Sequence, residues 1–437
     1  MQHMPPPTAC ITHGEMKHEL CHLSLAGLIL ASWLFTLSNR RKAVTLMDTN
    51  TLLPYGRQSL SEADLQAVMD VLRSDFLTQG PVTPQFEQAV ATYCQARHGV
   101  AVNSATAALH LACLALDLGP GDTLWTSPIT FVASANCALY CRAQVDFVDI
   151  DPVSYNMCPL ALEKKLQHAQ ASGTLPKIVV PVHLSGLPCD MAAIHALSIR
   201  YGFRIIEDAS HAIGARYGQA PVGNCQYSDI TVFSFHPVKI ITTGEGGMAM
   251  TNDPDLAKRM ARLRSHGITR DADEMTQESE GAWYYQQLEL GFNYRLTEIQ
   301  AALGLSQLQQ LASFIERRRQ LAQRYNALLA NLPLQLPHTN DSTKSALHLY
   351  VVRLKLPAGK PSRKEVFAQL RDAGILVNVH YIPVYAQPFY AKYGYDRAAY
   401  PESEKYYQEA ISLPLYPDLS FTQQDRVIAA LAKAIQR

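Results

Sequence analysis

Lys239 is the residue whose surroundings first suggest chemistry. It lies in the stretch FSFHPVKIITTGEGG, which runs from Phe233 to Gly247, and the overlapping segment DITVFSF is typical of a buried strand that leads into a turn. A lysine is rarely placed among apolar residues unless it is paired or functional. Burial lowers the pKa of an amine and frees it as a nucleophile, and nucleophilic lysines form Schiff bases with carbonyl groups. The alternative is an ordinary surface lysine on a loop.

A second group of residues is typical of an anion site. In NSATAALHLA, a short strand ends and Ser104, Ala105 and Thr106 open a helix. The first turn of a helix presents free N–H groups and a positive dipole end, which suit a phosphate. Ser234, five residues before Lys239, is a further candidate phosphate ligand. The alternative at the helix start is a well-capped helix without a ligand.

The remaining candidates suit a flat, basic ring. Asp208 ends the apolar segment RIIED, and a buried carboxylate needs a cationic partner, either a structural one or a protonated ring nitrogen. His211 follows one turn later and could face the same ligand. Phe131, at the start of a predicted helix, could stack on a ring or belong to the core. An amine, a phosphate site, a carboxylate and an aromatic side chain together predict pyridoxal 5′-phosphate (PLP) as the cofactor.

The elements that must position these groups alternate along the chain. Apolar strand segments such as QVDFVDI, KIVVPVHL and RIIED are separated by helical segments from about residue 59 onward. This alternation predicts an α/β fold with a mostly parallel sheet covered by helices on both faces. Ligands of such sheets gather beyond the carboxyl ends of the strands, where the candidate residues fall.

We divide the chain into three parts. Residues 1–50 form an N-terminal extension, residues 51–300 a large cofactor-binding domain, and residues 301–437 a linking helix with a smaller C-terminal α+β domain. The linking segment that begins with GFNYRLTEIQ is predicted to be one long helix with at most one break. In the small domain, LVNVHYIPV is predicted to be a strand and TQQDRVIAALAKAIQ the closing helix.

The N-terminal extension contains an apolar run, Leu23–Leu37, followed by Arg40, Arg41 and Lys42. The run is short for a membrane span, and its basic residues are on the wrong side for a signal peptide. We favour a start at Met47, where organised sequence begins. A membrane association then requires that residues 1–46 are translated.

Composition excludes several classes of protein. Lys plus Arg and Asp plus Glu are both 38 of 437 residues, so the chain lacks the basic field of a nucleic-acid-binding protein. The nine cysteines are scattered without a C-x-x-C pair, which argues against a disulfide framework or a zinc site and favours a cytoplasmic protein. We therefore expect no metal and no nucleic-acid partner.

Five segments resemble the DegT/DnrJ/EryC1 family of sugar aminotransferases: NSATAALHLA, EDASHAIGA, FSFHPVKIITTGEGGMAMTND, RLRSHG and GFNYRLTEIQAALGLSQL. The resemblance extends from about Pro54 to the C-terminus, in the same order. It implies the aspartate-aminotransferase (type I) fold of PLP-dependent transferases and a homodimer with shared active sites.

The resemblance also implies a role for each candidate residue. Lys239 would carry the cofactor as a Schiff base and move the proton, and Asp208 would pair with the pyridinium nitrogen. The other implied cofactor contacts are His211, Ser234, Ala105, Thr106, Phe131 and Asn293, the last reaching into the neighbouring subunit's site. The positions that match the family's nucleotide-sugar pocket are Tyr55, Leu77, Thr78, Ala105, Ser234, Asn293, His380 and Tyr381.

Two segments, YGRQSLSEADLQAVMDVLRSDFLTQGP and VHYIPVYAQPFY, are most similar to the transaminases of pseudaminic acid biosynthesis. The implied reaction moves an amino group from L-glutamate to C4 of a UDP-4-keto-6-deoxy-N-acetylhexosamine and gives UDP-4-amino-4,6-dideoxy-N-acetyl-β-L-altrosamine. The insertion TRDADEMTQESEGAWYYQQ would affect the choice of substrate more than the chemistry.

One alternative substrate class and two alternative functions remain, and Lys239 argues against the first of these functions, the dehydratase. The same chemistry could act on a GDP-perosamine-type sugar, a dTDP-4-amino sugar or UDP-4-amino-arabinose. A cofactor-dependent sugar dehydratase would have histidine in place of Lys239. A non-catalytic binding or regulatory protein is distant, because Lys239, Asp208 and Ser234 are all present.

Overall fold

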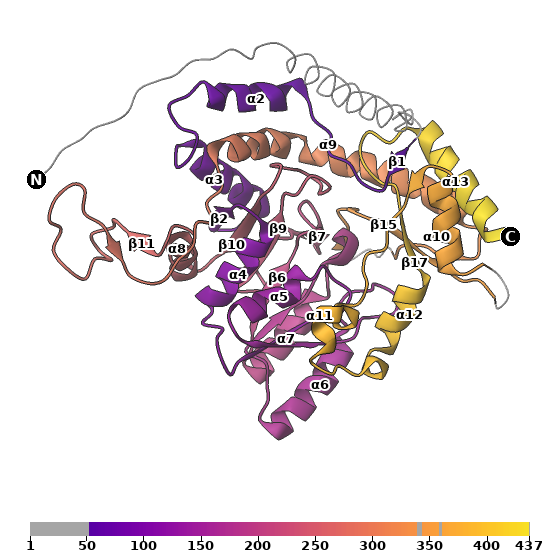
Figure 1. Cartoon of the computed structure of the whole chain (residues 1–437), viewed down its shortest axis with the longest axis horizontal. Helices are drawn as coiled ribbons and strands as arrows, with labels where there is room; N and C mark the ends of the chain where they lie inside the picture. Colours follow the sequence, from indigo (N-terminus) through magenta and orange to yellow (C-terminus); the bar gives the residue numbers. More distant parts are fainter. Residues whose placement is uncertain (1–51, 339–342, 358–360, 437) are drawn as a thin grey trace, which may run out of the picture. The chain divides into compact units, whose positions relative to one another are not determined.

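The computed structural model describes residues 52–338, 343–357 and 361–436 (Figure 1). The N-terminal extension, with its apolar run and the expected start at Met47, lies outside the described residues. Within the described residues, no helix is both long enough and apolar enough to cross a membrane.

A seven-stranded sheet forms the centre of the described part of the chain, in the order β2-β10-β9-β6-β5-β3-β4. Neighbouring strands are parallel except at β10, which is antiparallel to both β2 and β9. The mostly parallel sheet predicted from the alternating pattern is confirmed. The strands are β2 (His98–Val102), β3 (Thr123–Thr126), β4 (Gln144–Phe147), β5 (Ile178–Val180), β6 (Arg204–Asp208), β9 (Ile230–Ser234) and β10 (Gly247–Thr251).

Helices cover both faces of this sheet, which explains why its strands are apolar at consecutive positions. Along β9, Val232 packs in the cluster that includes helices α4, α5 and α8, whereas Phe233 packs in the cluster that includes α3 and α9. Successive strand residues point to opposite faces, so a sheet buried on both faces needs apolar residues at both. The covering helices are α3 (Val82–Cys94), α4 (Ala105–Ala115), α5 (Ala133–Tyr140), α6 (Pro159–Ser172), α7 (Met191–Tyr201), α8 (Pro254–Leu263) and α9 (Glu298–Leu329).

Helix α9 is a single unbroken helix of 32 residues, so the break allowed for in the linking segment does not occur. Its start is fixed by a capping box, in which Thr297 and Gln300 exchange side-chain and backbone hydrogen bonds. Helix α2 (Glu62–Leu72) lies alongside α9 in Figure 1, and the two helices pack together.

A smaller three-stranded sheet follows α9 and has its own apolar core. Helices α10 and α13 pack against each other and contribute to this core, together with the end of α9. The division at residues 300 and 301 stays a prediction. The elements are β13 (Leu334–Gln335), β15 (Tyr350–Leu354), β17 (Ala410–Leu413), α10 (Arg363–Asp372), α11 (Pro388–Ala391), α12 (Pro401–Glu409) and α13 (Phe421–Gln436).

The strand predicted over LVNVHYIPV is wrong for most of its length. Strand β16 comprises only Ile375–Leu376 and pairs with β1 (Leu53–Pro54), a strand of the same length. The pairing stops at Pro54, and the carbonyl of the next residue, Tyr55, accepts instead from the N–H of Leu415 at 3.0 Å. His380 and Tyr381 therefore lie in the loop that follows β16.

The remaining short strands form two small sheets. Strands β7 (Arg216–Tyr217), β8 (Ala220–Pro221) and β14 (Thr343–Lys344) pair with one another. Strands β11 (Ile268–Thr269) and β12 (Gln286–Gln287) pair antiparallel at the two ends of the predicted insertion.

Candidate active site

A cavity of about 610 Å³ lies at the carboxyl ends of β6 and β9, where the parallel sheet was expected to bind a ligand. Ten predicted site residues line this cavity. They are Tyr55, Ala105, Thr106, Phe131, Asp208, His211, Ser234, Lys239, His380 and Tyr381. Ala105, Thr106 and Phe131 lie at helix starts or just before them. Asp208 and Ser234 end strands, and His211 and Lys239 follow those strand ends. His380 and Tyr381 lie in the loop after β16.

Lys239 follows β9 in a tight turn, in which its backbone N–H donates to the carbonyl of His236 at 2.8 Å. Burial lowers the pKa of the Lys239 amine to about 8, and the nearby Asp208 carboxylate opposes part of this shift. The lowered pKa matches the expectation from the apolar sequence around this lysine, and it leaves a useful fraction of neutral amine near physiological pH.

Asp208 is the last residue of β6, and its side chain is 5% exposed. Its Oδ2 accepts a hydrogen bond from Ser134 Oγ at 2.6 Å, and its Oδ1 accepts one from the backbone N–H of Ser210 at 3.1 Å. Each carboxylate oxygen has two lone-pair directions, so both keep capacity for a further donor. A buried carboxylate with this capacity fits a protonated ring nitrogen.

The anion site predicted at the start of α4 is closely packed. Ser104 caps the helix by accepting from the N–H of Ala107 at 3.1 Å, which leaves the first two N–H groups of the helix without helical partners. A Cβ on Gly247 would lie 2.5 Å from the backbone N of Ala105. Gly247 is the register partner of Ser234, so glycine brings the Ser234 strand end and the helix start together. Two free N–H groups and the hydroxyl of Ser234 therefore line one corner of the cavity, and these are donors of the kind that bind a phosphate.

His211 is held as a neutral ring. Its Nδ1 accepts from the backbone N–H of Ser185 at 3.3 Å, and its Nε2 lies 3.2 Å from Tyr381 Oη. Because Nδ1 is an acceptor, the proton of the neutral imidazole is on Nε2 and faces the tyrosine. Burial, with the positive charge of Lys239 and the neighbouring His380, lowers the pKa of His211 well below its ordinary value.

His380 and Tyr381 are also uncharged near neutral pH. His380 Nδ1 lies 2.7 Å from Ser412 Oγ, and burial together with Lys239 lowers its pKa to about 3. Burial raises the pKa of Tyr381, and the neighbouring Tyr55 and Asp208 act in the same direction. The two residues can therefore donate or accept hydrogen bonds at one wall of the cavity without adding charge.

Three predicted substrate or cofactor contacts do not line the cavity in this chain. Thr78 forms a backbone bridge with Thr297, and the carbonyl of Leu77 accepts from the N–H of Glu298 at 3.0 Å. Asn293 forms a bridge with Ser265. All three lie on segments that flank α3, α8 or α9. Their roles in substrate binding stay predictions, and for Asn293 the predicted site is that of a second subunit.

Sequence reasoning missed several residues that support the site. Ser134 donates to Asp208 and is itself in contact with Thr130, and His348 packs its ring against His211 with centroids 4.4 Å apart. The local signal for Ser134 is its hydroxyl in the first turn of the helix that is predicted to start at Phe131. No local pattern marks His348, because its contact joins segments more than a hundred residues apart.

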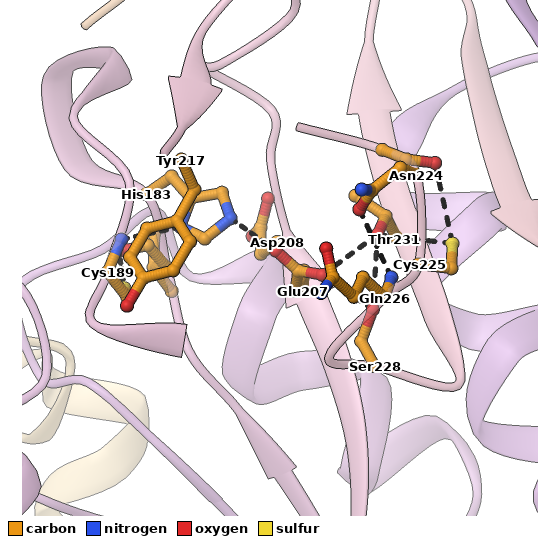
Figure 2. Close-up of polar contacts among 12 residues, drawn as sticks. His183, Cys189, Glu207, Asp208, Tyr217, Asn224, Cys225, Gln226, Ser228 and Thr231 are labelled. Carbon is orange, nitrogen blue, oxygen red and sulfur yellow. Dashed lines mark hydrogen bonds and ion pairs between the residues drawn. The ribbon is translucent and has the colours of Figure 1, made fainter. Parts of the chain in front are cut away.

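A buried polar network surrounds Glu207, the residue before Asp208 on β6 (Figure 2). Glu207 precedes Asp208 and points to the opposite face, where it accepts from His183 Nε2 at 2.7 Å, Ser228 Oγ at 2.5 Å and Thr231 Oγ1 at 3.1 Å. The backbone N–H of His183 donates to the Asp208 carbonyl at 3.1 Å. The network thus fixes the strand end from which Asp208 projects.

The chain matches the DegT/DnrJ/EryC1/StrS aminotransferase family over residues 58–432. Among curated proteins, it is 39% identical over 390 residues to the spore coat polysaccharide biosynthesis protein SpsC of Bacillus subtilis, covering 89% of this chain and 98% of that protein. It is 33% identical over 397 residues to the UDP-4-amino-4-deoxy-L-arabinose–oxoglutarate aminotransferase of Shewanella sediminis, covering 89% and 99% of the two chains.

Among solved structures, the chain superposes on Helicobacter pylori PseC, an aminotransferase involved in the biosynthesis of pseudaminic acid. The TM-score is 0.80 and the identity 31%, with 88% of this chain and 99% of that chain covered. The protein belongs to the DegT/DnrJ/EryC1/StrS family, has the type I fold and is a PLP-dependent sugar aminotransferase. The resemblance from sequence motifs is confirmed.

Proposed function

We propose that this sugar aminotransferase moves the amino group of L-glutamate to C4 of a UDP-4-keto-6-deoxy-N-acetylhexosamine. The product would be UDP-4-amino-4,6-dideoxy-N-acetyl-β-L-altrosamine, for pseudaminic acid biosynthesis. The observation that carries this choice of sugar is the similarity to PseC over nearly the whole chain, together with the matching segments around Tyr55 and His380. We further propose a cytoplasmic homodimer, in which Asn293 of one subunit completes the other subunit's site.

When bound, PLP would accept the electron pair that is released as a C–H bond next to the reacting nitrogen breaks. We assign the proton to Lys239 Nζ, which lines the cavity and has a pKa of about 8. As a free amine, Lys239 removes the Cα proton of the amino donor and later supplies a proton to C4 of the sugar. The donor and the sugar use the site in turn, so ping-pong kinetics are expected.

The other residues bind and orient. In our proposal, Asp208 pairs with the protonated ring nitrogen of the cofactor, and Phe131 stacks on the ring. Ser234 and the N–H groups of Ala105 and Thr106 bind the phosphate at the corner beside Gly247. Tyr55, His380 and Tyr381 form the wall of the cavity that would contact the sugar, through groups that stay neutral.

A second candidate substrate is supported by the relatives themselves. The Shewanella sediminis relative is named for UDP-4-amino-4-deoxy-L-arabinose, and the Bacillus subtilis relative for spore coat polysaccharide biosynthesis. The same residues would perform the same chemistry on a UDP-4-keto pentose, or on a dTDP- or GDP-linked 4-keto sugar. The chain's own segments favour the pseudaminic acid precursor over these.

Two half-reactions test the proposal separately. The purified protein, saturated with PLP, is treated with L-glutamate, and the loss of the visible absorbance of the lysine-bound cofactor is recorded. After glutamate is removed, UDP-, dTDP- and GDP-linked 4-keto sugars are added one at a time, and the product is identified by mass spectrometry and NMR. We expect the UDP-4-keto-6-deoxy-N-acetylhexosamine to restore the absorbance fastest.

Lys239→Ala serves as the control, because it removes both the lysine linkage and the proton carrier. If another 4-keto sugar restores the absorbance faster, the proposed sugar is wrong and the aminotransferase assignment is unaffected. If glutamate causes no loss of absorbance while another amino acid does, the proposed donor is wrong.

A further inference from the structure

Ser134 makes a direct and fully buried contact with the carboxylate of Asp208. It lies in the first turn of α5 and is 0% exposed, and its Oγ is 2.6 Å from Asp208 Oδ2. An ionised carboxylate can only accept hydrogen bonds, so the single proton of the serine hydroxyl is donated to Asp208. A charge-assisted bond of this kind is short and stronger than a bond between neutral groups.

Thr130 extends this contact towards the cavity. Its Oγ1 lies 2.7 Å from Ser134 Oγ, and it is 2% exposed. Since Ser134 has already given its proton to Asp208, Thr130 is the donor to Ser134. The three side chains form a directed chain of hydrogen bonds, from Thr130 to Ser134 to Asp208, and Thr130 itself lines the cavity.

The hydroxyl of Ser134 is not needed to cap helix α5. The capping position is Val132, and no side chain makes a cap bond there. Among the described residues, the only backbone contact of Ser134 Oγ, with the carbonyl of Phe131, is longer at 3.3 Å. The local structure therefore leaves the Asp208 carboxylate as the main partner of the hydroxyl.

We infer that Ser134, supported by Thr130, is a positioning residue that holds the Asp208 carboxylate in the orientation required by the ring nitrogen of PLP. The same chain of hydrogen bonds links Asp208 to the turn that carries Phe131. It therefore positions together the carboxylate that meets the ring nitrogen and the aromatic side chain that stacks on the face of the ring. The inference rests on the role proposed for Asp208, and it does not depend on which sugar is aminated.

The test is equilibrium binding of PLP to the cofactor-free protein, followed by absorbance and fluorescence. Ser134→Ala should raise the Kd for PLP about tenfold, because one hydrogen bond to a charged group is lost. Thr130→Val should have a smaller effect in the same direction, about threefold, because it removes only the donor to Ser134. The pH dependence of the bound cofactor's absorbance should shift in both variants.

Ser127→Ala is a matched control. Ser127 is another buried serine, 1% exposed, and its hydroxyl has no hydrogen-bond partner among the described residues. Its replacement removes the same atom from the same part of the fold and should leave PLP affinity within twofold of wild type. Circular dichroism and thermal unfolding of each variant establish that the protein is folded.

A double-mutant cycle with Asp208→Asn distinguishes positioning from a general structural effect. If Ser134 acts through Asp208, Ser134→Ala should weaken PLP binding much less in the Asp208→Asn background than in wild type. The inference is overturned if Ser134→Ala behaves like Ser127→Ala, or if its effect is the same in both backgrounds. Should Ser134→Ala not fold, the same cycle with Thr130→Val decides. A wild-type protein that binds PLP but aminates no sugar would refute the proposed function and leave this inference standing.

Discussion

Replacing Asp208 by asparagine should lower the pKa of Lys239 in the cofactor-free protein below its value of about 8. Two effects set that value. Burial lowers the pKa from the ordinary 10.5, and the negative charge of Asp208 partly restores it. Asparagine keeps the size of the side chain and removes the charge, so that the effect of burial is left unopposed.

The magnitude follows from the fraction of neutral amine. With a pKa of about 8, about 9% of Lys239 is uncharged at pH 7, whereas an ordinary lysine would have about 0.03% of its amine uncharged. Below pH 8 the amine becomes increasingly protonated, and above pH 8 it becomes mostly neutral. Lys239 should therefore react roughly 300-fold faster at pH 7 than an exposed lysine of equal intrinsic reactivity. The Asp208→Asn variant should react faster still.

Competitive acetylation measures this pKa directly. The cofactor-free protein is treated with trace acetic anhydride at a series of pH values, and the extent of labelling at Lys239 is read by mass spectrometry of its peptide. Exposed lysines in the same digest provide the internal reference. Asp372→Asn is the control, because it removes an exposed carboxylate at the end of α10, away from the cavity residues.

Two results would refute the reasoning. Labelling of Lys239 with a midpoint near 10.5 would show that its surroundings do not desolvate it. A midpoint that rises or stays unchanged in Asp208→Asn, while the Asp372→Asn control matches wild type, would show that the carboxylate does not act on the amine.

Three further predictions concern the start of α9, the cavity wall and the assembly. Glu298→Ala should lower the free energy of unfolding by about 3 kcal/mol in urea titrations, since the buried Glu298 carboxylate accepts from the backbone N–H of Thr83 at 3.1 Å and from the Thr83 hydroxyl. An unchanged unfolding midpoint would mean that water replaces these contacts. Tyr381→Phe should reduce kcat/KM about tenfold with little change in stability, because it removes only the hydroxyl that contacts a neutral histidine at 3.2 Å; an equal loss of stability would point to a structural role. If the proposed homodimer shares its sites, refolding inactive Lys239→Ala and Asn293→Ala chains together should restore about a quarter of wild-type activity, since half of the dimers would be mixed and each mixed dimer would have one intact site. No recovery would refute the proposed shared site.

The sequence was most informative where strands end. Asp208 and Lys239 could be predicted because each follows an apolar run that is recognisable as a buried strand, and parallel neighbours bring such ends to one edge. Ser104, Ala105 and Thr106 could be predicted as a candidate anion site because a strand ends just before them and they open a helix, and Gly247 packs closely against this helix start. These features depend on local patterns and on one general rule of sheet topology.

The sequence was least informative where a contact joins distant segments. The hydrogen bond from Ser134 to Asp208 spans 74 residues, and that from Tyr381 to His211 spans 170. Neither pair has a local signature, because the partners meet only after helix α5 and the loop that follows β16 pack near the end of β6. The predicted strand over LVNVHYIPV was too long because strand length also depends on a distant partner. The segment LVNV continues past Leu376, but the two-residue partner strand β1 limits the pairing.

The electrostatics of the cavity depend on histidines that stay uncharged. His211, His348 and His380 all lie near Lys239, and burial lowers the pKa of each, with the positive charge of Lys239 adding to the effect. A charged imidazole here would compete with Lys239 for Asp208 and would lower the lysine's pKa further. With neutral imidazoles, the protonation of Lys239 is governed mainly by its burial and by one carboxylate. Under the proposed function, the wall around His380 contacts the sugar through neutral groups, so a change of sugar contacts in that wall would leave the pKa of Lys239 near 8.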